Sequence, residues 1–329
     1  HDKRSLLENI AYGEREREVV TKILGRRLGY KEAPVLYSGA AMQKLNALCR
    51  EMTFIPVRPE KLWLSVYDPV EENIKALNDF KPDIIRSYGS YLDLLFREVA
   101  SCGRNFRLPK LFVYGCDNLT DEVKELIEGE YGIPVMSYYN SIESFRIAFS
   151  CEESAGFHIH DDLCHLKVLN ENDEMSTEGE SGRVVISNLV NRATVLLNYV
   201  LGDIGSLAEG PCPCGRTFSL LKRLEGRMDD IIHMPDGRFI HPRLIWSVFV
   251  GRREVLQYQF IQHLPGSFEL KVVTVDKESY ARVIDDVISD IRANLGGQVK
   301  IEATYYDKIE RSKGGKFRPV ISLVKSRMA

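Results

Sequence analysis

The spacing of apolar and polar residues predicts a helical start, followed by a succession of helices and strands. Residues 4–50 place apolar residues at helical spacing, with one break near the segment KEAPVLYSG. Two further helices are predicted at residues 69–80 and 91–103, and the second ends on a glycine suited to a C-terminal cap. Between them, the segment KPDIIRSYGS predicts a short strand and a turn.

A strand, a helix and a second strand then follow with short connections. The segment KLFVYG predicts a buried strand, DEVKELIEGEYG a helix that begins with acidic residues, and IPVMSYYN another strand. This order is typical of a parallel sheet with a right-handed crossover. Ligand sites in such sheets lie beyond the carboxyl ends of the strands, where the segments GCDNLT and YNSIES fall.

The pattern changes at about residue 157 to short strands of alternating polarity. FHIH, HLKVLN, GRVVISNLV and VLLNYV predict an antiparallel sheet or barrel that joins the parallel sheet. From about Asp230 onward, the strands VLQYQFIQHL, FELKVVTV and VKIEATYY accompany the amphipathic helix YARVIDDVISDIRANLGG. The sequence therefore predicts a large α/β domain over residues 1–228 and a small α+β domain over residues 229–329.

Composition narrows the classes of function. The chain has 329 residues, 44% of them hydrophobic, and a net charge of −3, which gives no electrostatic reason to expect nucleic acid or an anionic membrane as a partner. Cations such as Arg15 and Arg17, or Arg252 and Arg253, have acids close by in sequence and are expected on solvated helix faces. No apolar run reaches membrane-spanning length, and HDKRSLLENI is too charged for a signal peptide, so a cytoplasmic protein is expected.

The cysteines suggest a metal site. Seven cysteines, an odd number, favour reduced thiols or a metal over a disulfide framework. The segments CEESAGFHIH and PCPCGR supply sulfur and imidazole ligands in two groups, which suit a closed tetrahedral zinc site. The predicted ligands are Cys151, His158, Cys212 and Cys214. A metal with no open coordination position is structural and contributes on the order of 10 kcal/mol to local folding.

Alternatives to this ligand set stay open at the level of the sequence. His160 can replace His158, because residues two apart on a strand face the same side, and Cys164 and His165 can also compete. In another interpretation, the cysteines are buried structural residues and the histidine lies on the surface. Cys-x-Cys is also tighter than the usual Cys-x-x-Cys spacing of a zinc site.

Near the end of the chain, the segment ERSKGGKFRPV places two glycines among cations. Gly314 and Gly315 permit a tight turn that presents Lys316 as a mobile charge. A solvated hairpin turn before a last strand is the alternative. The phosphate-loop pattern GxxxxGK[ST] is absent here, because Phe317 follows the lysine.

Several motifs indicate a protein family only when their order along the chain is considered. Asp203 lies at a Gly-Asp turn in NYVLGD, and Arg227 and Asp229 lie in the charged segment EGRMDD; singly, these are a turn and a salt-bridged linker. The succession GCDNLT, YYNSIES, NYVLGD, EGRMDD and GGKFR resembles the adenylate-forming superfamily of acyl-CoA synthetases, luciferases and peptide-synthetase adenylation domains. FKPDII, the C…GxH segment and CPCGRT resemble its phenylacetate-CoA ligase branch, which includes capsular-biosynthesis proteins and coenzyme F390 synthetases. The resemblance covers roughly residues 75 to 325.

The resemblance implies a role for each matching residue. Tyr139 corresponds to the aromatic residue that packs on adenine, and Glu143 to the acid that holds Mg²⁺ near the phosphates. Asp203 and Arg227 correspond to the residues that bind the ribose hydroxyls. The remaining matches are Gly115, Cys116 and Asp117 at the border of the acyl and adenine pockets, Asp229 as the hinge, and Lys316 as the lysine that reaches the α-phosphate and the substrate carboxylate.

The resemblance also implies a fold and an activity. The fold would be the adenylate-forming one, with a parallel sheet and a small β-barrel in the large domain. The activity would be ATP-dependent conversion of a carboxylic acid to its acyl-adenylate and AMP-forming transfer to a thiol, most often coenzyme A. Alternatives are transfer to an amine, a hydroxyl or a carrier protein, and a nucleotide-binding homologue with impaired catalysis. Family relatives are often dimers, which makes a homodimer one expectation.

The sequence also departs from the family. The Ser/Thr/Gly-rich phosphate loop is missing, and YSGAAM, residues 37–42, is too apolar to replace it. Either the protein is a short form, or the loop has been left out of the sequence. Asn140 and Ile142 replace a glycine and a hydroxyl residue, and Ile142 removes an oxygen that would face phosphate or Mg²⁺.

The acid itself cannot be named from the sequence. Tyr88, Tyr91, Tyr114 and Tyr138 would line an aromatic and polar pocket suited to an aryl or hydroxylated acid if they face it, or they pack in the core with their hydroxyls satisfied.

Overall fold

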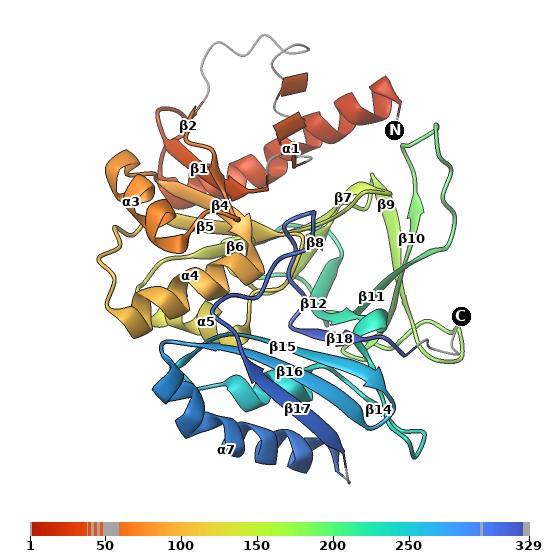
Figure 1. Cartoon of the computed structure of the whole chain (residues 1–329). Helices are drawn as coiled ribbons and strands as arrows, with labels where there is room; N and C mark the ends of the chain where they lie inside the picture. The colour runs from red at the N-terminus through yellow and green to blue at the C-terminus, as the bar shows by residue number, and fades with distance from the viewer. Residues whose placement is uncertain are drawn as a thin grey trace. The chain divides into compact units, whose positions relative to one another are not determined.

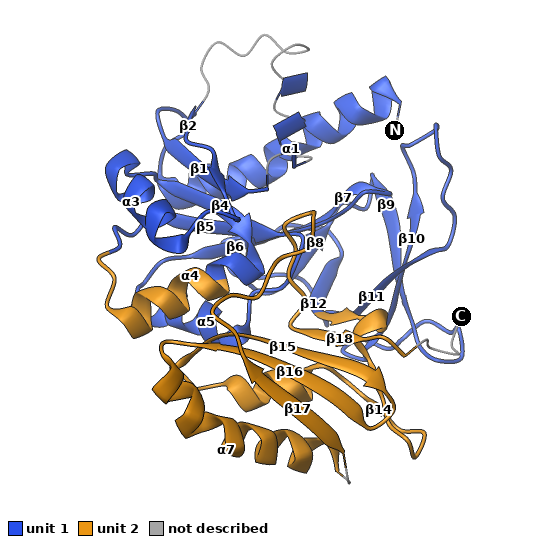
Figure 2. Ribbon diagram, viewed as in Figure 1, with its two compact units in different colours: residues 1–92, 106–224 blue, residues 93–105, 225–329 orange. Residues whose placement is uncertain are grey.

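The computed structural model describes residues 2–37, 39–40, 43–44, 47–48, 59–296 and 299–324 (Figure 1). Part of the segment YSGAAM, namely Ser38, Ala41 and Met42, lies outside these residues. The chain forms two compact units, coloured separately in Figure 2. One contains residues 1–92 and 106–224, and the other contains residues 93–105 and 225–329.

The first unit is built on a mixed sheet. Its strands are β1 (Lys31–Leu36), β2 (Glu60–Lys61), β3 (Leu64–Ser65), β4 (Ile84–Tyr88), β5 (Leu111–Gly115), β6 (Val135–Ser141), β7 (Phe145–Ser150), β8 (Phe157–Ile159), β9 (Cys164–Leu169), β10 (Gly182–Asn188), β11 (Tyr199–Leu207) and β12 (Leu220–Arg227), the last of which ends in the second unit. They are ordered β2-β1-β4-β5-β6-β7-β8-β12-β11-β10-β9, with β3 paired to β1. Neighbours from β2 to β6 run parallel, whereas β6 and β7, and β9 and β10, pair antiparallel. The antiparallel strands thus join the parallel sheet directly.

The helices whose bounds can be given from the described residues accompany these strands. They are α1 (Lys3–Leu24), α3 (Val70–Phe80), α4 (Gly89–Cys102) and α5 (Asp121–Glu125), which continues as a π-helical turn (Leu126–Glu130). Helix α4 starts in the first unit and continues in residues of the second.

Helix α1 ends earlier than the apolar spacing predicts. The Asp2 carboxylate accepts the Ser5 N–H at its start, and Gly25 ends it at φ +67°, a conformation that glycine adopts without strain. The predicted break near KEAPVLYSG coincides with residues 31–36, which form β1 and are almost entirely buried; the strand itself was not predicted. A short apolar run without polar alternation fits a buried parallel strand as well as a buried helix, so spacing cannot separate the two.

One face of the parallel strands packs beneath α1. Val19, Val20 and Leu24 of the helix share a buried cluster with residues of the strands, namely Ile84, Leu111, Val113 and Met136. Such burial stabilises the pair by roughly 1.5–3 kcal/mol for each large apolar side chain. The carboxyl ends of β5 and β6, where the predicted site residues lie, are therefore supported by a rigid layer.

The second unit is an α+β structure. It contains η2 (Met228–Asp230), β13 (Ile232–His233), β14 (Phe239–Ile240), α6 (Arg243–Trp246), η3 (Ser247–Phe249), β15 (Val255–Leu264), β16 (Ser267–Thr274), α7 (Lys277–Leu295), β17 (Lys300–Tyr305) and β18 (Val320–Ser322). Four of its strands are ordered β17-β16-β15-β18. Helix α7 buries Val287 and Ile291 in a cluster with Phe260 and Phe268 of this sheet. Within the described residues, no helix is both long and apolar enough to cross a membrane.

Candidate functional site

The loop after β5 carries three of the predicted site residues. Gly115 pairs with Tyr138 of β6, and a Cβ atom at Gly115 would lie 3.2 Å from the Tyr138 carbonyl oxygen. Cys116 is exposed and has a positive φ of 71°, unusual for a residue with a side chain. The segment GCDNLT thus begins at the carboxyl end of β5, where the sequence predicted it, and the chain turns sharply there.

Asp117, the next residue, holds the start of helix α4. Its carboxylate accepts the Ser90 backbone N–H at 3.0 Å and the Ser90 hydroxyl at 2.6 Å. The neighbouring Gly89 lies so close to this loop that a Cβ atom there would fall 2.3 Å from the backbone nitrogen of Leu119. The fold therefore locks the β5 loop to the helix that follows β4.

The structure brings Tyr139 and Asp203 together. The Tyr139 hydroxyl, at the end of β6, donates to the Asp203 carboxylate of β11 at 2.7 Å, across 64 residues of sequence. Tyr139 is buried, in a cluster with Ile147 and Leu201. The residues matched to adenine and ribose binding are thus directly hydrogen-bonded.

Glu143 lies in the turn between β6 and β7 and is partly exposed. In the described part of the chain, it forms no ion pair. Ile142 beside it is 89% exposed, so the substitution of the family's hydroxyl residue places an apolar side chain at the surface of this turn. The turn is constrained, because the Ser144 N–H donates to the Ser141 hydroxyl and Phe145 has a φ of +63°.

Three predicted site residues belong to the second unit. Arg227 ends β12, and its guanidinium lies 3.8 Å from the Asp229 carboxylate, a weak and largely exposed ion pair. Lys316 lies exposed in the loop before β18, between the buried residues Gly315 and Phe317. None of the ion pairs among the described residues involves Lys316.

The tyrosines considered for an aromatic pocket are largely core residues. The Tyr91 hydroxyl accepts from the Asn73 amide at 2.8 Å, and the Tyr138 hydroxyl accepts from Arg86 at 3.0 Å. Burial raises the pKa of Tyr114 to about 12, against a hydrogen bond with Ser137 that lowers it. The hydroxyls of Tyr91 and Tyr138 are therefore satisfied within the protein, which removes the sequence argument for an aryl acid at these two positions.

A compact group of candidate metal ligands forms in the first unit. The ligand atoms of Cys151, His158, Cys212 and Cys214 all lie within 4.8 Å of one another. The Cys151 and Cys212 sulfurs are 3.6 Å apart, and the Cys214 sulfur is 3.4 Å from His158 Nε2. A tetrahedral zinc with sulfur ligands has edges of about 3.8 Å, so the set fits such an ion.

The thiols of the set differ in their protonation chemistry. Burial raises the pKa of Cys151 to about 12, which favours the thiol, whereas hydrogen bonds from Arg216 outweigh burial and lower the pKa of Cys214, which favours the thiolate that metals bind. Burial lowers the pKa of His158, which favours the neutral imidazole that metals bind. Within the described residues, His158 Nδ1 is buried without a hydrogen-bond partner.

His160 takes a different environment from His158. Its Nδ1 atom lies 3.3 Å from Arg15, and its Nε2 atom lies 3.6 Å from the Glu16 carboxylate. The Phe149 ring lies close to both imidazoles, with ring centroids 5.6 Å from His158 and 5.0 Å from His160. Among the described residues, His158 rather than His160 joins the cysteines.

Helix α1 supplies buried charges that the sequence analysis missed. Arg15 pairs with Asp162 at 2.6 Å, and the buried Glu16 pairs with Arg146. Arg15 remains partly exposed, but its partner lies 147 residues away and not close by in sequence, so only the fold brings the two together. Arg17 does pair locally, with Glu14 at 2.8 Å.

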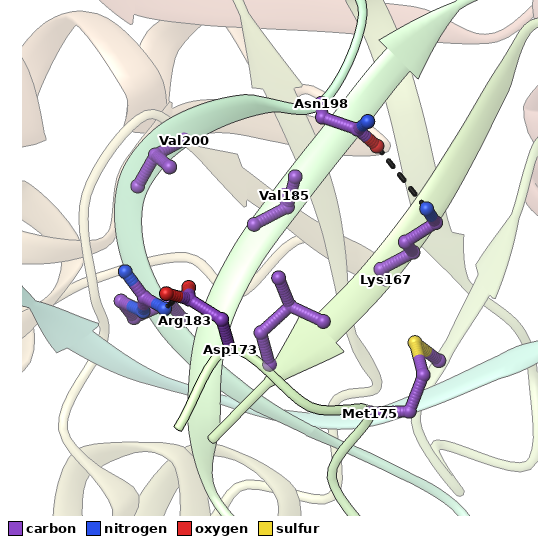
Figure 3. Close-up of a pocket in the computed structure, with 8 residues that line it drawn as sticks. Lys167, Asp173, Met175, Arg183, Val185, Asn198 and Val200 are labelled. Carbon is purple, nitrogen blue, oxygen red and sulfur yellow. Dashed lines mark hydrogen bonds and ion pairs between the residues drawn. The ribbon is translucent and has the colours of Figure 1, made fainter. Parts of the chain in front are cut away.

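A cavity of about 390 Å³ lies elsewhere on the first unit, on strands β9 to β11 (Figure 3). Val185 and Val200 are among its apolar lining, and the Lys167 ammonium donates to the Asn198 side chain at 3.1 Å at its edge. Arg183 and Asp173 form an ion pair beside it. None of its lining residues is a predicted site residue, so the cavity is separate from the candidate site.

Comparisons with known proteins place this geometry in context. A family model described as the CapK C-terminal domain matches residues 232–323. Two curated relatives are each 27% identical: phenylacetate-coenzyme A ligases of Thermus thermophilus, over 78% of this chain and 63% of that protein, and of Pseudomonas putida, over 74% and 58%. The chain thus spans about three fifths of the length of these relatives.

The solved structures agree in fold. A 2-hydroxyisobutyryl-CoA ligase in complex with R3-HIB-AMP matches with a TM-score of 0.73 and 18% identity, over 96% of this chain and 70% of that chain. The predicted fold class is confirmed. Together, these comparisons confirm the predicted resemblance of this chain to the adenylate-forming superfamily and, within it, to the phenylacetate-coenzyme A ligases and CapK.

Proposed function

We propose that this chain belongs to an AMP-forming ligase, which activates a carboxylic acid with ATP and passes the acyl group to a thiol such as coenzyme A. The observation that carries the proposal is the 2.7 Å hydrogen bond between Tyr139 and Asp203, which unites the residues matched to adenine and ribose binding. The relatives named as phenylacetate-coenzyme A ligases support the reaction class.

In the first step, a carboxylate oxygen of the acid attacks the α-phosphorus of ATP. The bond from this phosphorus to the bridging oxygen breaks, and pyrophosphate leaves with the electron pair. Both reactants are anions, so a cation is required where charge develops. Lys316 is proposed to supply that charge, and its exposed position between two buried neighbours suits a group that reaches toward a ligand.

The second step transfers the acyl group. A thiolate sulfur attacks the carbonyl carbon of the acyl-adenylate, the bond from this carbon to the phosphate oxygen breaks, and AMP leaves. The proposed roles of Asp203 and Arg227 are to hold the ribose, which positions the nucleotide without chemical action. Gly115, Cys116 and Asp117 border the acyl and adenine pockets in this proposal, and Asp229, between the proposed domains of residues 1–228 and 229–329, is the hinge.

Two metals belong to the proposal. Glu143, a partly exposed carboxylate, would hold Mg²⁺ together with phosphate oxygens, and the ion would neutralise phosphate charge. Cys151, His158, Cys212 and Cys214 would hold a structural Zn²⁺, which joins three separate segments of the first unit.

The test is ATP–pyrophosphate exchange with a panel of aliphatic, hydroxylated and aryl carboxylic acids. Exchange with any acid would establish adenylation. AMP release that depends on coenzyme A would identify the thiol acceptor, whereas AMP release only with an amine or a carrier protein would favour the alternative acceptors. Absence of exchange and of AMP binding by the complete protein would contradict the proposal.

One observation favours weaker nucleotide chemistry as a second candidate. Ile142 presents an apolar, 89% exposed side chain where the family has a hydroxyl. Replacement of Ile142 by Thr should raise the exchange rate if the missing oxygen limits phosphate handling. An unchanged rate would remove the support for an impaired homologue.

A further inference from the structure

The hinge turn η2 contains two acidic residues with different environments. The Asp229 carboxylate is largely exposed, whereas the Asp230 side chain is only 12% exposed. Arg318 Nε donates to Asp230 Oδ1 at 2.8 Å, and a terminal nitrogen of the same guanidinium donates to that oxygen as well. This terminal nitrogen also lies 3.3 Å from the Asp229 carbonyl oxygen. A single guanidinium therefore contacts two consecutive residues of the hinge turn.

Arg318 is itself fixed to the central strand of the second unit. Its carbonyl oxygen accepts the Gln259 side-chain amide at 3.1 Å, and the next carbonyl, that of Pro319, accepts the Phe260 N–H at 2.8 Å. Strand β18 then pairs in parallel with β15. The hinge turn is thus tied to β15 through one side chain.

The loop that carries Lys316 is fixed from the same side. Phe317 is buried in a cluster with Leu256, Val273 and Ile309. The Ser312 N–H donates to the Lys316 carbonyl at 3.0 Å, which closes the loop on itself. Lys316 therefore projects from a braced loop, two residues from the guanidinium that holds the hinge turn.

We infer that Arg318 is a positioning residue for the proposed adenylation: by pairing with Asp230, it joins the hinge turn and the Lys316 loop into one rigid body. The inference rests on the proposed function for its kinetic consequence. A backbone rotation at Asp229 then moves Lys316 by the same angle, because Asp230 and the lysine loop belong to the same rigid body. The rotation itself must take place before Asp230.

Arginine is required for this arrangement by its shape. A planar guanidinium reaches the Asp230 carboxylate and the Asp229 carbonyl at once, whereas the single ammonium of a lysine is a point charge. Arg318→Lys should therefore retain the ion pair and lose the second contact. Arg238 offers a matched control, because it also binds a carboxylate, that of Asp236 at 2.7 Å, and a backbone carbonyl, that of Gly296 at 2.8 Å, away from the lysine loop.

The first experiment is hydrogen–deuterium exchange of the purified protein without substrates. In Arg318→Met, amides of residues 311–317 should exchange roughly tenfold faster than in the unmodified protein, while Arg238→Met should leave them unchanged. Unchanged protection of these amides in Arg318→Met would overturn the inference. If Arg318→Met fails to fold, the double variant with Asp230→Asn avoids a buried unpaired charge and gives the same comparison.

The second experiment is pyrophosphate exchange with the acid that the panel identifies. Arg318→Met should lower kcat roughly 10- to 100-fold with little change in the KM for ATP, and Arg318→Lys should recover part of the loss. Equal kcat values for Arg318→Met and the unmodified protein would contradict the positioning role. A lack of exchange by the unmodified protein would instead contradict the proposed function, and the deuterium experiment would still decide whether the two segments form one body.

Discussion

The Tyr139 hydroxyl donates a 2.7 Å hydrogen bond to the Asp203 carboxylate, and this bond orients the acid matched to ribose binding. A carboxylate has about four acceptor positions, and the phenol uses one of them to hold the Asp203 side chain in place.

Removal of this hydroxyl should weaken nucleotide binding. Tyr139→Phe keeps the ring but removes this hydrogen bond to the Asp203 carboxylate, and we expect AMP to bind roughly tenfold more weakly in titration calorimetry. Tyr138→Phe is the matched control, because that hydroxyl on the same strand bonds to Arg86 instead of Asp203. Equal affinity in Tyr139→Phe and the unmodified protein would show that the hydrogen bond does not orient the acid.

Replacement of Lys316 should affect chemistry more than binding. Lys316→Ala is expected to lower pyrophosphate exchange by on the order of 10²–10³ and to leave AMP affinity within about twofold, because the charge acts where it develops. Lys313→Ala removes another exposed lysine of the same loop and should retain full exchange. An exchange rate in Lys316→Ala equal to that of Lys313→Ala would refute the assignment.

The cysteine and histidine set should hold zinc. We expect one zinc per chain by elemental analysis, and its loss in Cys212→Ser together with a fall of roughly 10 °C or more in Tm. Cys102→Ser, at an exposed cysteine outside the set, should keep both the metal and the Tm. Purified protein that contains no zinc, or a Tm that does not change when a chelator is added, would favour buried structural thiols.

Acid should weaken the fold through Glu32. Burial raises the pKa of Glu32, but Arg86 and Lys61 outweigh burial and hold it below its usual range. A lowered folded pKa contributes stability at pH values above the unfolded pKa of about 4.3, and this stability is lost as the pH falls through the folded pKa. Glu32→Gln should therefore cost about 3 kcal/mol at pH 7 and progressively less below pH ~4 in urea unfolding.

Glu60 provides the control for this measurement. It pairs with Lys31 at 3.4 Å on the neighbouring strand, but both side chains are exposed. Glu60→Gln should cost less than about 1 kcal/mol at pH 7. If both variants showed the same pH dependence of the unfolding free energy, the buried ion pair would not be its source.

Glycine is required at position 89. A Cβ atom there would fall 2.3 Å from Leu119 N and 2.4 Å from Asn118 C, both backbone atoms that cannot give way without moving the β5 loop. Gly89→Ala should destabilise the protein by roughly 2–4 kcal/mol in urea unfolding. Gly129→Ala, at a glycine with no neighbour within 4 Å of the new atom, should be neutral or stabilising. Equal effects of the two substitutions would exclude steric contact as the cause.

Most helices and strands could be predicted from local sequence, but the pairing of residues far apart in the chain could not. The caps of α1 and α7 depend on residues within a few positions, so Gly25 and Gly296 ended their helices as capping chemistry requires. The strand at residues 31–36 was missed because both of its faces are buried, which removes the polar alternation that distinguishes a strand.

The candidate site was likewise predictable from the sequence only in part. The four candidate metal ligands could be picked out because their types and spacing suit that chemistry, whereas the choice of His158 over His160 depends on which side chains of other segments surround each ring. The ion pair of Arg15 with Asp162 and that of Asp230 with Arg318 join residues far apart in the chain, and the residues next to them in sequence do not predict these pairs. Charged pairs of this kind are products of the fold.

The contact between Cys151 and Cys212 closes a ring in the chain. The two sulfurs are 61 residues apart in sequence, and strands β8 to β11 lie between them. The proposed zinc would tie this ring at its base and remove conformational freedom from the unfolded chain, by about 4 kcal/mol in the chain-entropy description of a covalent link. With its ends tied in this way, the strands inside would search for partners over shorter loops, which would speed their pairing. Zinc binding would thereby let the antiparallel part of the sheet assemble ahead of the rest of the chain.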